Sequence, residues 1–358
     1  MDRVAPAHGP KPRGKPDPCL QSISAEPVDS NSASGETHRQ SEEGQTEIAD
    51  GEQARRVKHD LTIKAQDGIT LAVRDHGGNG PPILLMHGAG THLLAVESLA
   101  AALSGHRVVT MDQRWSGQSG DSHPYSWDVL VDDVDSVLAA LDLGNAAVGG
   151  HSWGGMIATH YGARHPDAPA VFNLDGHGPG DPSLYDGIDP QEVEALTRRM
   201  ADLPAWLDTE GDADWRELAM VGVRKAALAT GAPPADVEAF AERSFLPLSN
   251  GRWRLRPSRT MYEGLTGDLR MFDLYRRVDG PLLIVVSGGR DWGPRSTEAL
   301  MAAYRRGLLR ALDELAAERP NLKVVQLPEA DHVGLTGADA PAVAEIIRVF
   351  LDGLGYTT

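Results

Sequence analysis

The stretch Gly149-Gly150-His151-Ser152-Trp153-Gly154-Gly155 sets one serine between two pairs of glycines. An apolar run at 146–148 precedes it, and a helical pattern follows it to about residue 163. In the pattern G-x-S-x-G between a strand and a helix, the serine sits on a tight turn that only small residues two positions away can accommodate. The first amides of the helix point at this turn and can stabilise an oxyanion. We therefore interpret Ser152 as a nucleophile.

A serine hydroxyl needs a base to remove its proton, and the chain offers 13 histidines. His332 follows the last apolar run, 323–327, which predicts a loop position at the same edge of the sheet as Ser152. His151 adjoins the serine, and we expect its side chain to point elsewhere. We therefore predict that His332 is the general base.

The histidine in turn needs a carboxylate that fixes its tautomer and stabilises the imidazolium. Asp291 follows the apolar run 282–286, and the turn Gly288-Gly289 before it can present the carboxylate. Asp175 follows the run 170–174 and is the rival, although capping of its own turn would also explain it. The chain order Ser, Asp, His holds for either residue. We predict Asp291 as the acid and keep Asp175 as the alternative.

Two backbone amides are expected to bind the oxyanion. One is the N–H of Trp153, directly after the nucleophile, and the other is the N–H of Ala89, in the loop after the apolar run 82–86. Glycines in that loop permit close approach of the backbone. The residues predicted to contact the substrate lie near these groups: His87, Gly88, Gly90, His177 and Trp292.

Short apolar runs alternate with amphipathic helical patterns along most of the chain. Near the start, the runs 61–63 and 69–73 flank Asp67-Gly68, which is a hairpin signal. The alternation predicts an α/β fold, a mostly parallel, doubly wound sheet with helices on both faces. The further strands are expected at 82–86, 107–111, 146–148, 170–174, 282–286 and 323–327, and the helices at 93–103, 126–143, 296–318 and 341–354, besides the one after Ser152.

Two segments depart from this rhythm. Residues 177–265 have helical patterns without a parallel-strand run, which predicts a helical insertion over one end of the sheet, between core segments 58–176 and 266–358. Residues 1–57 are rich in Pro, Ser, Gly, Glu and Gln and have few large apolar side chains. Such a segment cannot bury enough surface to offset its ordering entropy, so we expect a disordered tail.

Composition narrows the range of partners. The formal net charge of −17 disfavours a nucleic-acid partner, and no apolar run approaches the length of a membrane span. Cys19 is the single cysteine, so no disulfide can form within the chain, and the start lacks a signal-peptide core. We expect a cytoplasmic protein with no metal and no cofactor, because neither H-E-x-x-H nor a phosphate loop is present. The oligomeric state is left open.

In chain order, His87-Gly88-Ala89-Gly90, the segment 112–119, the Ser152 turn, Asp291 and His332 resemble the α/β-hydrolase fold superfamily over residues 59–355. The resemblance implies that the insertion is a cap domain. Trp115 departs from the family pattern, which more often has glycine there, and we expect its ring to pack. A serine at the elbow disfavours the epoxide-hydrolase and haloalkane-dehalogenase branches. The segment 150–155 is also similar to elbows of esterases, prolyl aminopeptidases and cofactor-free haloperoxidases.

These features predict a serine hydrolase that acts on a small or medium acyl compound, most simply a carboxylic ester, through an acyl-enzyme. An aminopeptidase or amidase, or a haloperoxidase-like activity, is the alternative use of the same residues. A ligand-binding receptor that has kept the fold is the non-enzymatic alternative.

Overall fold

The computed structural model describes residues 58–178, 181–201, 210–229, 232, 234–257, 270–288 and 298–356, with side chains for all except 196–201, 229 and 298. The predicted tail, 1–57, lies outside this part of the chain, as do Asp291 and Trp292. Residues 54–358 form one compact unit, which includes the predicted insertion.

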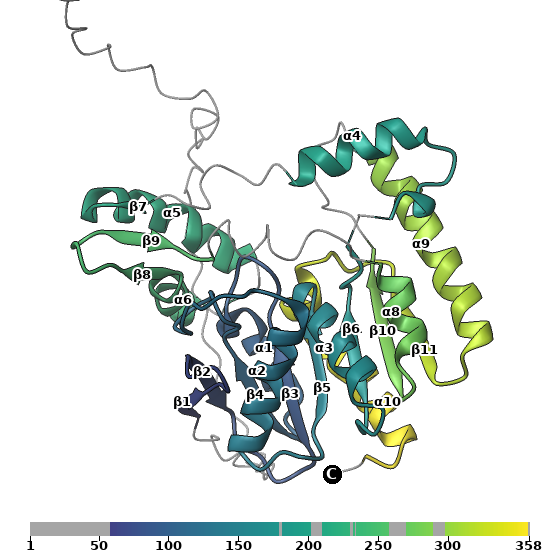
Figure 1. Ribbon diagram of the computed structural model, residues 1–358, viewed down its shortest axis with the longest axis horizontal. Coiled ribbons are helices and arrows are strands. Elements are labelled where there is room, and N and C mark those ends of the chain that lie inside the picture. Colours follow the sequence, from purple (N-terminus) through teal and green to yellow (C-terminus); the bar gives the residue numbers. More distant parts are fainter. Residues whose placement is uncertain are drawn as a thin grey trace, which may run out of the picture. The chain divides into compact units, whose positions relative to one another are not determined.

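An eight-stranded sheet carries the fold (Figure 1). Its strands are β1 (His59–Lys64), β2 (Thr70–Asp75), β3 (Pro82–Met86), β4 (Arg107–Met111), β5 (Ala147–His151), β6 (Val171–Leu174), β10 (Leu282–Ser287) and β11 (Leu322–Leu327). They lie in the order β1-β2-β4-β3-β5-β6-β10-β11. The first two form the predicted antiparallel hairpin. The other six strands, β3, β4, β5, β6, β10 and β11, run parallel to one another. The predicted mostly parallel sheet is confirmed.

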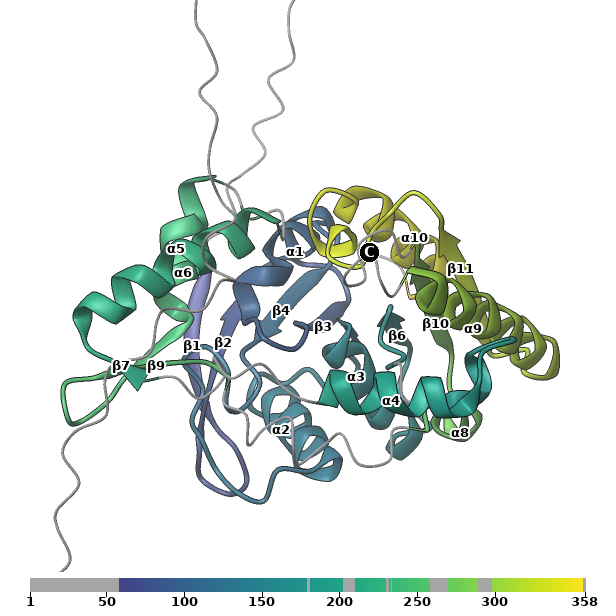
Figure 2. The same cartoon turned by 90° about the horizontal axis from the view of Figure 1, so that it is seen from above.

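Helices cover both faces of this sheet. They are α1 (Glu97–Ala102), which continues the short helix η2 (Leu93–Val96), α2 (Trp127–Ala140), α3 (Trp153–Arg164), α8 (Met271–Arg277), α9 (Glu298–Glu318) and α10 (Ala340–Gly353), preceded by η7 (Gly334–Thr336). Seen from above, α1 and α10 lie on one side, and α2, α3 and α8 lie on the other (Figure 2). Within the described ranges, no helix is both long and apolar enough to cross a membrane.

The covering of both faces explains why a central strand such as β3 is apolar throughout. Ile83 and Leu85 of β3 belong to the core beneath α1 and α10, whereas Leu84 and Met86 belong to the core beneath the opposite helices. All four side chains are fully buried. A strand buried on both sides has no solvent-facing position, so its sequence reads as a nearly continuous apolar run.

The sequence predicts a helical insertion between β6 and β10, but the structure shows that this insertion also contains strands. Its elements are η3 (Pro182–Leu184), α4 (Pro190–Ala201), β7 (Glu210–Gly211), α5 (Ala213–Ala229), η5 (Pro234–Asp236), α6 (Val237–Arg243), β8 (Phe245–Pro247) and β9 (Trp253–Leu255). The last two strands and β7 form a small antiparallel sheet in the order β7-β9-β8. Its strands have two or three residues, too few for an alternating pattern to be visible in the sequence.

Buried ion pairs join the insertion to the core. Arg243, the last residue of α6, places Nη2 2.7 Å from Oδ2 of Asp112, which is completely buried after β4. Arg256 donates to the carbonyls of Gly117 (2.6 Å) and Ser119 (2.7 Å). Burial by itself raises the pKa of Asp112, but the charge and hydrogen bonds of Arg243, together with the neighbouring His92 and His87, outweigh burial and lower this pKa. The insertion is therefore docked through an ionised carboxylate on the loop 112–119.

Trp115 lies in the same loop, and its surroundings explain why tryptophan can stand where the family more often has glycine. Its φ of +67° belongs to the left-handed region, where glycine is the usual residue. The ring is 9% exposed and packs into the core, as expected, and Nε1 donates to the carbonyl of Ser122 (2.9 Å). Packing and this hydrogen bond offset the cost of the unusual backbone conformation.

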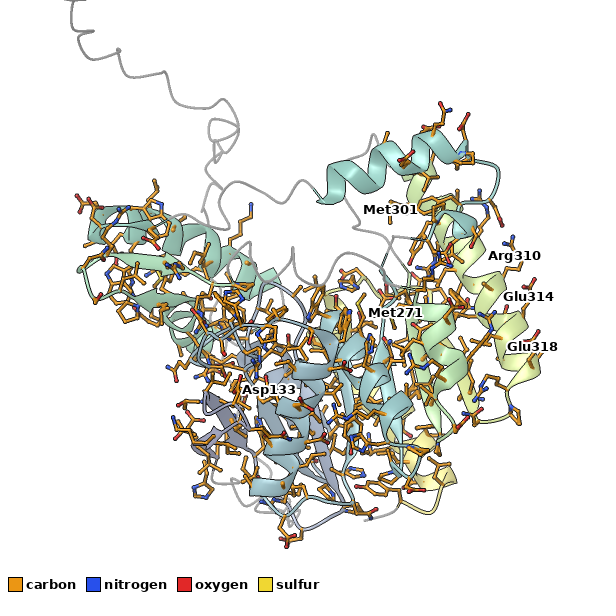
Figure 3. All side chains as sticks on the ribbon, in the orientation of Figure 1. Asp133, Met271, Met301, Arg310, Glu314 and Glu318 are labelled. Atoms are coloured by element: carbon orange, nitrogen blue, oxygen red, sulfur yellow. The ribbon has the colours of Figure 1, made fainter. Side chains whose placement is uncertain are left out.

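A buried ion pair beneath α2 gives the first stability prediction. Asp133 lies on α2 among the packed side chains (Figure 3) and receives two 2.6 Å hydrogen bonds from Arg114, with both side chains 1% exposed. Asp133→Ala leaves the guanidinium without its buried counter-charge, so the free energy of unfolding should fall by about 3–5 kcal/mol. Urea denaturation measures this loss. Asp67→Asn is the matched control, because Asp67 is a half-exposed second partner of Arg114 and its loss should cost about 1 kcal/mol or less. Equal losses in the two variants would contradict the prediction.

Buried histidines predict how stability depends on pH. Burial lowers the pKa of His92 to about 3 and that of His76 and His160 to about 4. In the unfolded chain these rings take up protons below about pH 6.5, whereas in the folded protein they stay neutral. The free energy of unfolding is therefore highest above about pH 6.5 and declines as the pH falls toward 4. Each unit of pKa difference corresponds to about 1.4 kcal/mol. Urea unfolding should show a lower free energy of unfolding at about pH 5 than at about pH 7.5. His92→Phe should make this difference between the two pH values smaller. A stability that stays level over this range would refute the prediction.

Candidate active site

Ser152 occupies the turn between β5 and α3, where the motif predicts it. Its φ of 53° and ψ of −116° lie in a region that residues with a side chain rarely adopt. Its N–H donates to the carbonyl of Leu174 (2.8 Å), and its carbonyl accepts from the N–H of Met156 (3.1 Å). The strained conformation is therefore held from both sides, by β6 and by the first turn of α3.

The flanking glycines are required by space. A Cβ on Gly150 would lie 2.5 Å from the carbonyl carbon of Gly154, and a Cβ on Gly154 would lie 2.6 Å from the carbonyl oxygen of Met86. Both distances are far shorter than van der Waals contact. The backbones of β3, β5 and α3 thus meet at the turn, and only glycine fits at these two positions.

His332 lies in the loop after β11 and faces a carboxylate. Its Nδ1 is 2.8 Å from Oδ2 of Asp175, and the two side chains are 18% and 6% exposed. An ionised carboxylate only accepts hydrogen bonds, so Nδ1 carries the proton and Nε2 keeps its lone pair. This tautomer is the one that a general base needs.

Asp175 receives further hydrogen bonds from β10, and a histidine of its own loop lies nearby. Ser287 donates its N–H to Oδ1 (3.1 Å) and its hydroxyl to Oδ2 (2.6 Å), while Nε2 of His177 lies 3.7 Å from Oδ1. Burial by itself raises the pKa of Asp175. The hydrogen bonds from His332 and Ser287 and the neighbouring His177 outweigh burial and hold that pKa well below its usual value. The carboxylate is therefore ionised at neutral pH.

The order of the strands brings these groups together. Ser152 follows β5, Asp175 follows β6, Ser287 ends β10 and His332 follows β11, and these four strands are neighbours in that order. Because the strands are parallel, their carboxyl ends meet at one edge of the sheet, which is where open α/β sheets bind ligands.

Of the two candidate acids, the structure brings Asp175 to His332. Asp291, which we had preferred, lies outside the described residues. The sequence pattern did not single out Asp175, because the turn there explains an aspartate locally, and its φ of +59° is tolerated by Asp better than by most residues. The reach of its carboxylate across β10 to His332 becomes visible only in the sheet.

The loop after β3 passes directly beside Ser152. A Cβ on Gly88 would lie 3.2 Å from the Cβ of Ser152. Ala89 is partly exposed and Gly90 is exposed, with a φ of +76°. Trp153 is the first residue of α3. The loop and the helix start are thus adjacent to Ser152, and the amides of Ala89 and Trp153 remain the predicted oxyanion donors.

Two histidines that we expected to contact the substrate lie beneath the surface instead. His87 is completely buried: Nδ1 lies 2.8 Å from the carbonyl of Gly88, and Nε2 accepts the N–H of Gln113 (3.1 Å). His177 is 6% exposed, and its Nδ1 is 2.8 Å from the hydroxyl of Tyr275. These contacts favour a loop-shaping role for His87 and a place behind Asp175 for His177.

Three residues of the site were not assigned a role from the sequence. Ser287 and Tyr275 contact Asp175 and His177, and the only local signal for Ser287 was a hydroxyl at the end of an apolar run. His151, which we expected to point elsewhere, places Nε2 2.7 Å from the carbonyl of His332. Contacts between residues so far apart in the chain leave no trace in a local pattern.

The chain is similar to known α/β hydrolases. 2-(Acetamidomethylene)succinate hydrolase of Mesorhizobium japonicum is 28% identical over 270 residues, which are 74% of this chain and 85% of that protein. The crystal structure of E-2-(acetamidomethylene)succinate hydrolase superposes with a TM-score of 0.59 at 25% identity, covering 83% of this chain and 100% of the other. AB hydrolase superfamily protein YisY of Bacillus subtilis is 38% identical over 109 residues, which are 30% of this chain and only 40% of that protein.

The family pattern described as the alpha/beta hydrolase fold matches residues 81–265, more than half of the chain. That segment contains the loop after β3, the serine turn, β6 with Asp175, and most of the insertion. The match agrees with the sheet order and with the position of Ser152, and the protein belongs to the α/β-hydrolase fold family.

Proposed function

We propose that the protein is a serine hydrolase in which Ser152 is the nucleophile, His332 the general base and Asp175 the acid. The observation that carries this proposal is the 2.8 Å hydrogen bond from Nδ1 of His332 to Asp175, at the same sheet edge as the strained serine turn. In this proposal Asp175 replaces Asp291, our first choice. The family supports hydrolase activity, and the assignment of the individual residues is ours.

The proposed reaction proceeds through an acyl-enzyme. Nε2 of His332 takes the proton of the Ser152 hydroxyl as its oxygen attacks the acyl carbonyl. The amides of Ala89 and Trp153 stabilise the oxyanion, and Asp175 stabilises the imidazolium. His332 then protonates the leaving group and activates the water that releases the acid.

A small or medium carboxylic ester is the simplest substrate for these groups. A second candidate is an acyl compound that carries a carboxylate, because the relative matched over 85% of its length is named for a substrate with an acetamido group and a succinate. In a chain with a net charge of −17, an anionic substrate requires a local cation. Arg305 on α9 meets this requirement.

One hydrogen bond of a neighbouring residue and the electrostatic influence of Asp175 support a position of Arg305 near the acid. The preceding residue, Tyr304, donates its hydroxyl to the carbonyl of Gly178 (2.8 Å), directly after His177. The charge of Asp175 raises the pKa of Arg305 against the larger lowering effect of burial, and the charge of Arg305 in turn lowers the pKa of His177. This half-buried guanidinium forms no ion pair within the described part of the chain and so has donors to offer a carboxylate.

The side of α9 that carries Arg305 is distinct from its solvent side. Met301, one helical turn earlier on the same face, is partly buried against the core, whereas Arg310, Glu314 and Glu318 lie along the outer side of the helix (Figure 3). Residues four positions apart share a face of a helix, so Arg305 projects from the inner side.

Other uses of the same residues remain as alternatives. Aminopeptidase, amidase and haloperoxidase-like activities would each rely on Ser152, while a ligand-binding receptor would not need the serine at all. Turnover of a p-nitrophenyl ester separates the receptor from the enzymes, and an aminoacyl arylamide separates an aminopeptidase from an esterase.

The triad assignment predicts a clear order among variants. Ser152→Ala should abolish fluorophosphonate labelling and lower kcat by about 10⁶-fold, because nothing else supplies the nucleophile. Asp175→Asn should lower kcat by about 10⁴-fold, because the amide favours the wrong histidine tautomer. Both are assayed with p-nitrophenyl butyrate after circular dichroism has verified folding.

Asp291→Asn is the matched control for the acid and should keep most of the activity. A severe loss in Asp291→Asn together with a mild one in Asp175→Asn would return the acid role to Asp291. A fully active Ser152→Ala variant would overturn the proposal altogether.

Arg305 is tested with two esters that differ in one carboxylate. Arg305→Ala should raise KM for p-nitrophenyl hemisuccinate by about 10-fold or more, because a hydrogen bond to a charged group contributes about 1.5–3 kcal/mol. KM for the neutral p-nitrophenyl butyrate should not change. Arg306→Ala, on the exposed side of α9, is the control and should behave like the wild type with both esters. An equal effect of Arg305→Ala on the two esters would exclude carboxylate recognition by this residue.

A further inference from the structure

The residue before the nucleophile makes a contact that the proposed mechanism does not use. Nε2 of His151 lies 2.7 Å from the carbonyl oxygen of His332, and the two rings are 4.5 Å apart at an angle of 44°. We infer that His151 is a positioning residue, which holds the backbone of the general base at a fixed distance from Ser152. This inference rests on the proposed function.

The contact fixes which nitrogen of His151 carries the proton. A carbonyl oxygen only accepts hydrogen bonds, so Nε2 must be the donor and Nδ1 keeps its lone pair. Burial and the charge of His332 lower the pKa of His151 to about 3, so the ring is neutral wherever His332 works as a base. A neutral donor holds the carbonyl without adding a second charge beside the imidazolium that forms on His332.

The ring is also confined on its other side. A Cβ on Gly88 would lie 3.1 Å from Nδ1 of His151, tighter than ordinary contact. His151 itself is 8% exposed. The imidazole is therefore held between the loop after β3 and the loop after β11 and has little freedom to release its partner.

The base is consequently held at two points. Its ring is held by Asp175 on one side, and its backbone carbonyl is held by His151 on the other. Because His151 and Ser152 are consecutive residues on a strained turn, a hydrogen bond to the first sets the distance of His332 from the second. Another support of the loop, from the N–H of Gly288 to the carbonyl of Ala330 (2.6 Å), lies two residues earlier. His151 thus adds a restraint at the base itself.

Two substitutions separate the hydrogen bond from the shape of the ring. His151→Phe keeps an aromatic ring of similar size and removes the donor, while His151→Gln places an amide N–H near the position of Nε2. With p-nitrophenyl butyrate, His151→Phe should lower kcat by about 10²-fold, the effect of a misplacement of about 1 Å, with little change in KM. His151→Gln should recover most of this loss. The rate of fluorophosphonate labelling should follow kcat, and His165→Phe, at the far end of α3, should match the wild type.

The possible results are distinct. A fully active His151→Phe variant, or a His151→Gln variant as impaired as His151→Phe while both fold normally, would overturn the inference. If His151→Phe does not fold, His151→Gln is compared with His151→Asn, whose amide is too short to reach: activity in the first and loss in the second support the inference, and equal activities overturn it. Failure of the proposed function itself would appear separately, as labelling that survives Ser152→Ala.

Discussion

The hydrogen bond between His332 and Asp175 is the contact on which the site depends. It joins residues 157 positions apart, and it forms only because β6, β10 and β11 are neighbours in the sheet. The middle strand is not a passive spacer, since Ser287 at its end donates twice to the same carboxylate. With three donors in a buried position, Asp175 is stabilised as an anion and orients the imidazole of His332. The geometry of the proposed acid and base is therefore a property of the sheet edge rather than of either loop.

A second set of buried charges holds the surroundings of the site in place. Asp112 accepts from the N–H groups of Leu93 and Gln118 as well as from Arg243 of the insertion. Burying such a pair is costly unless its hydrogen bonds are satisfied, and here they are. Nε2 of His92 also lies 2.9 Å from the carbonyl of Phe240 in α6. His92, in the connection after β3, and Asp112, after β4, are thus both tied to α6 of the insertion.

Backbone strain is concentrated where the chemistry is proposed. Ser152 and Asp175 both have positive φ angles, of 53° and 59°, and each follows a strand of the central sheet. Such conformations persist when the surrounding structure leaves no alternative. Gly150 and Gly154 give the serine turn its room, and the N–H of Asp175 donates to the carbonyl of Val285 in β10 (2.8 Å). The sheet thereby holds in place two side chains that local preferences alone would not present.

The strands of the main sheet and the serine turn could be predicted from the sequence, because both depend on residues that are close together in the chain. Apolar runs located the strands of the main sheet, and G-x-S-x-G located the turn of Ser152, since close packing of backbones there admits only glycine. The same reasoning preferred Asp291 to Asp175 from position alone, although a carboxylate at a strand end looks alike in both places. It also missed the three short strands of the insertion and the contact of His151 with His332. Those features depend on which strands are neighbours and on where a side chain reaches across them. Only the tertiary structure decides this, since the contacts join residues that are distant in the chain.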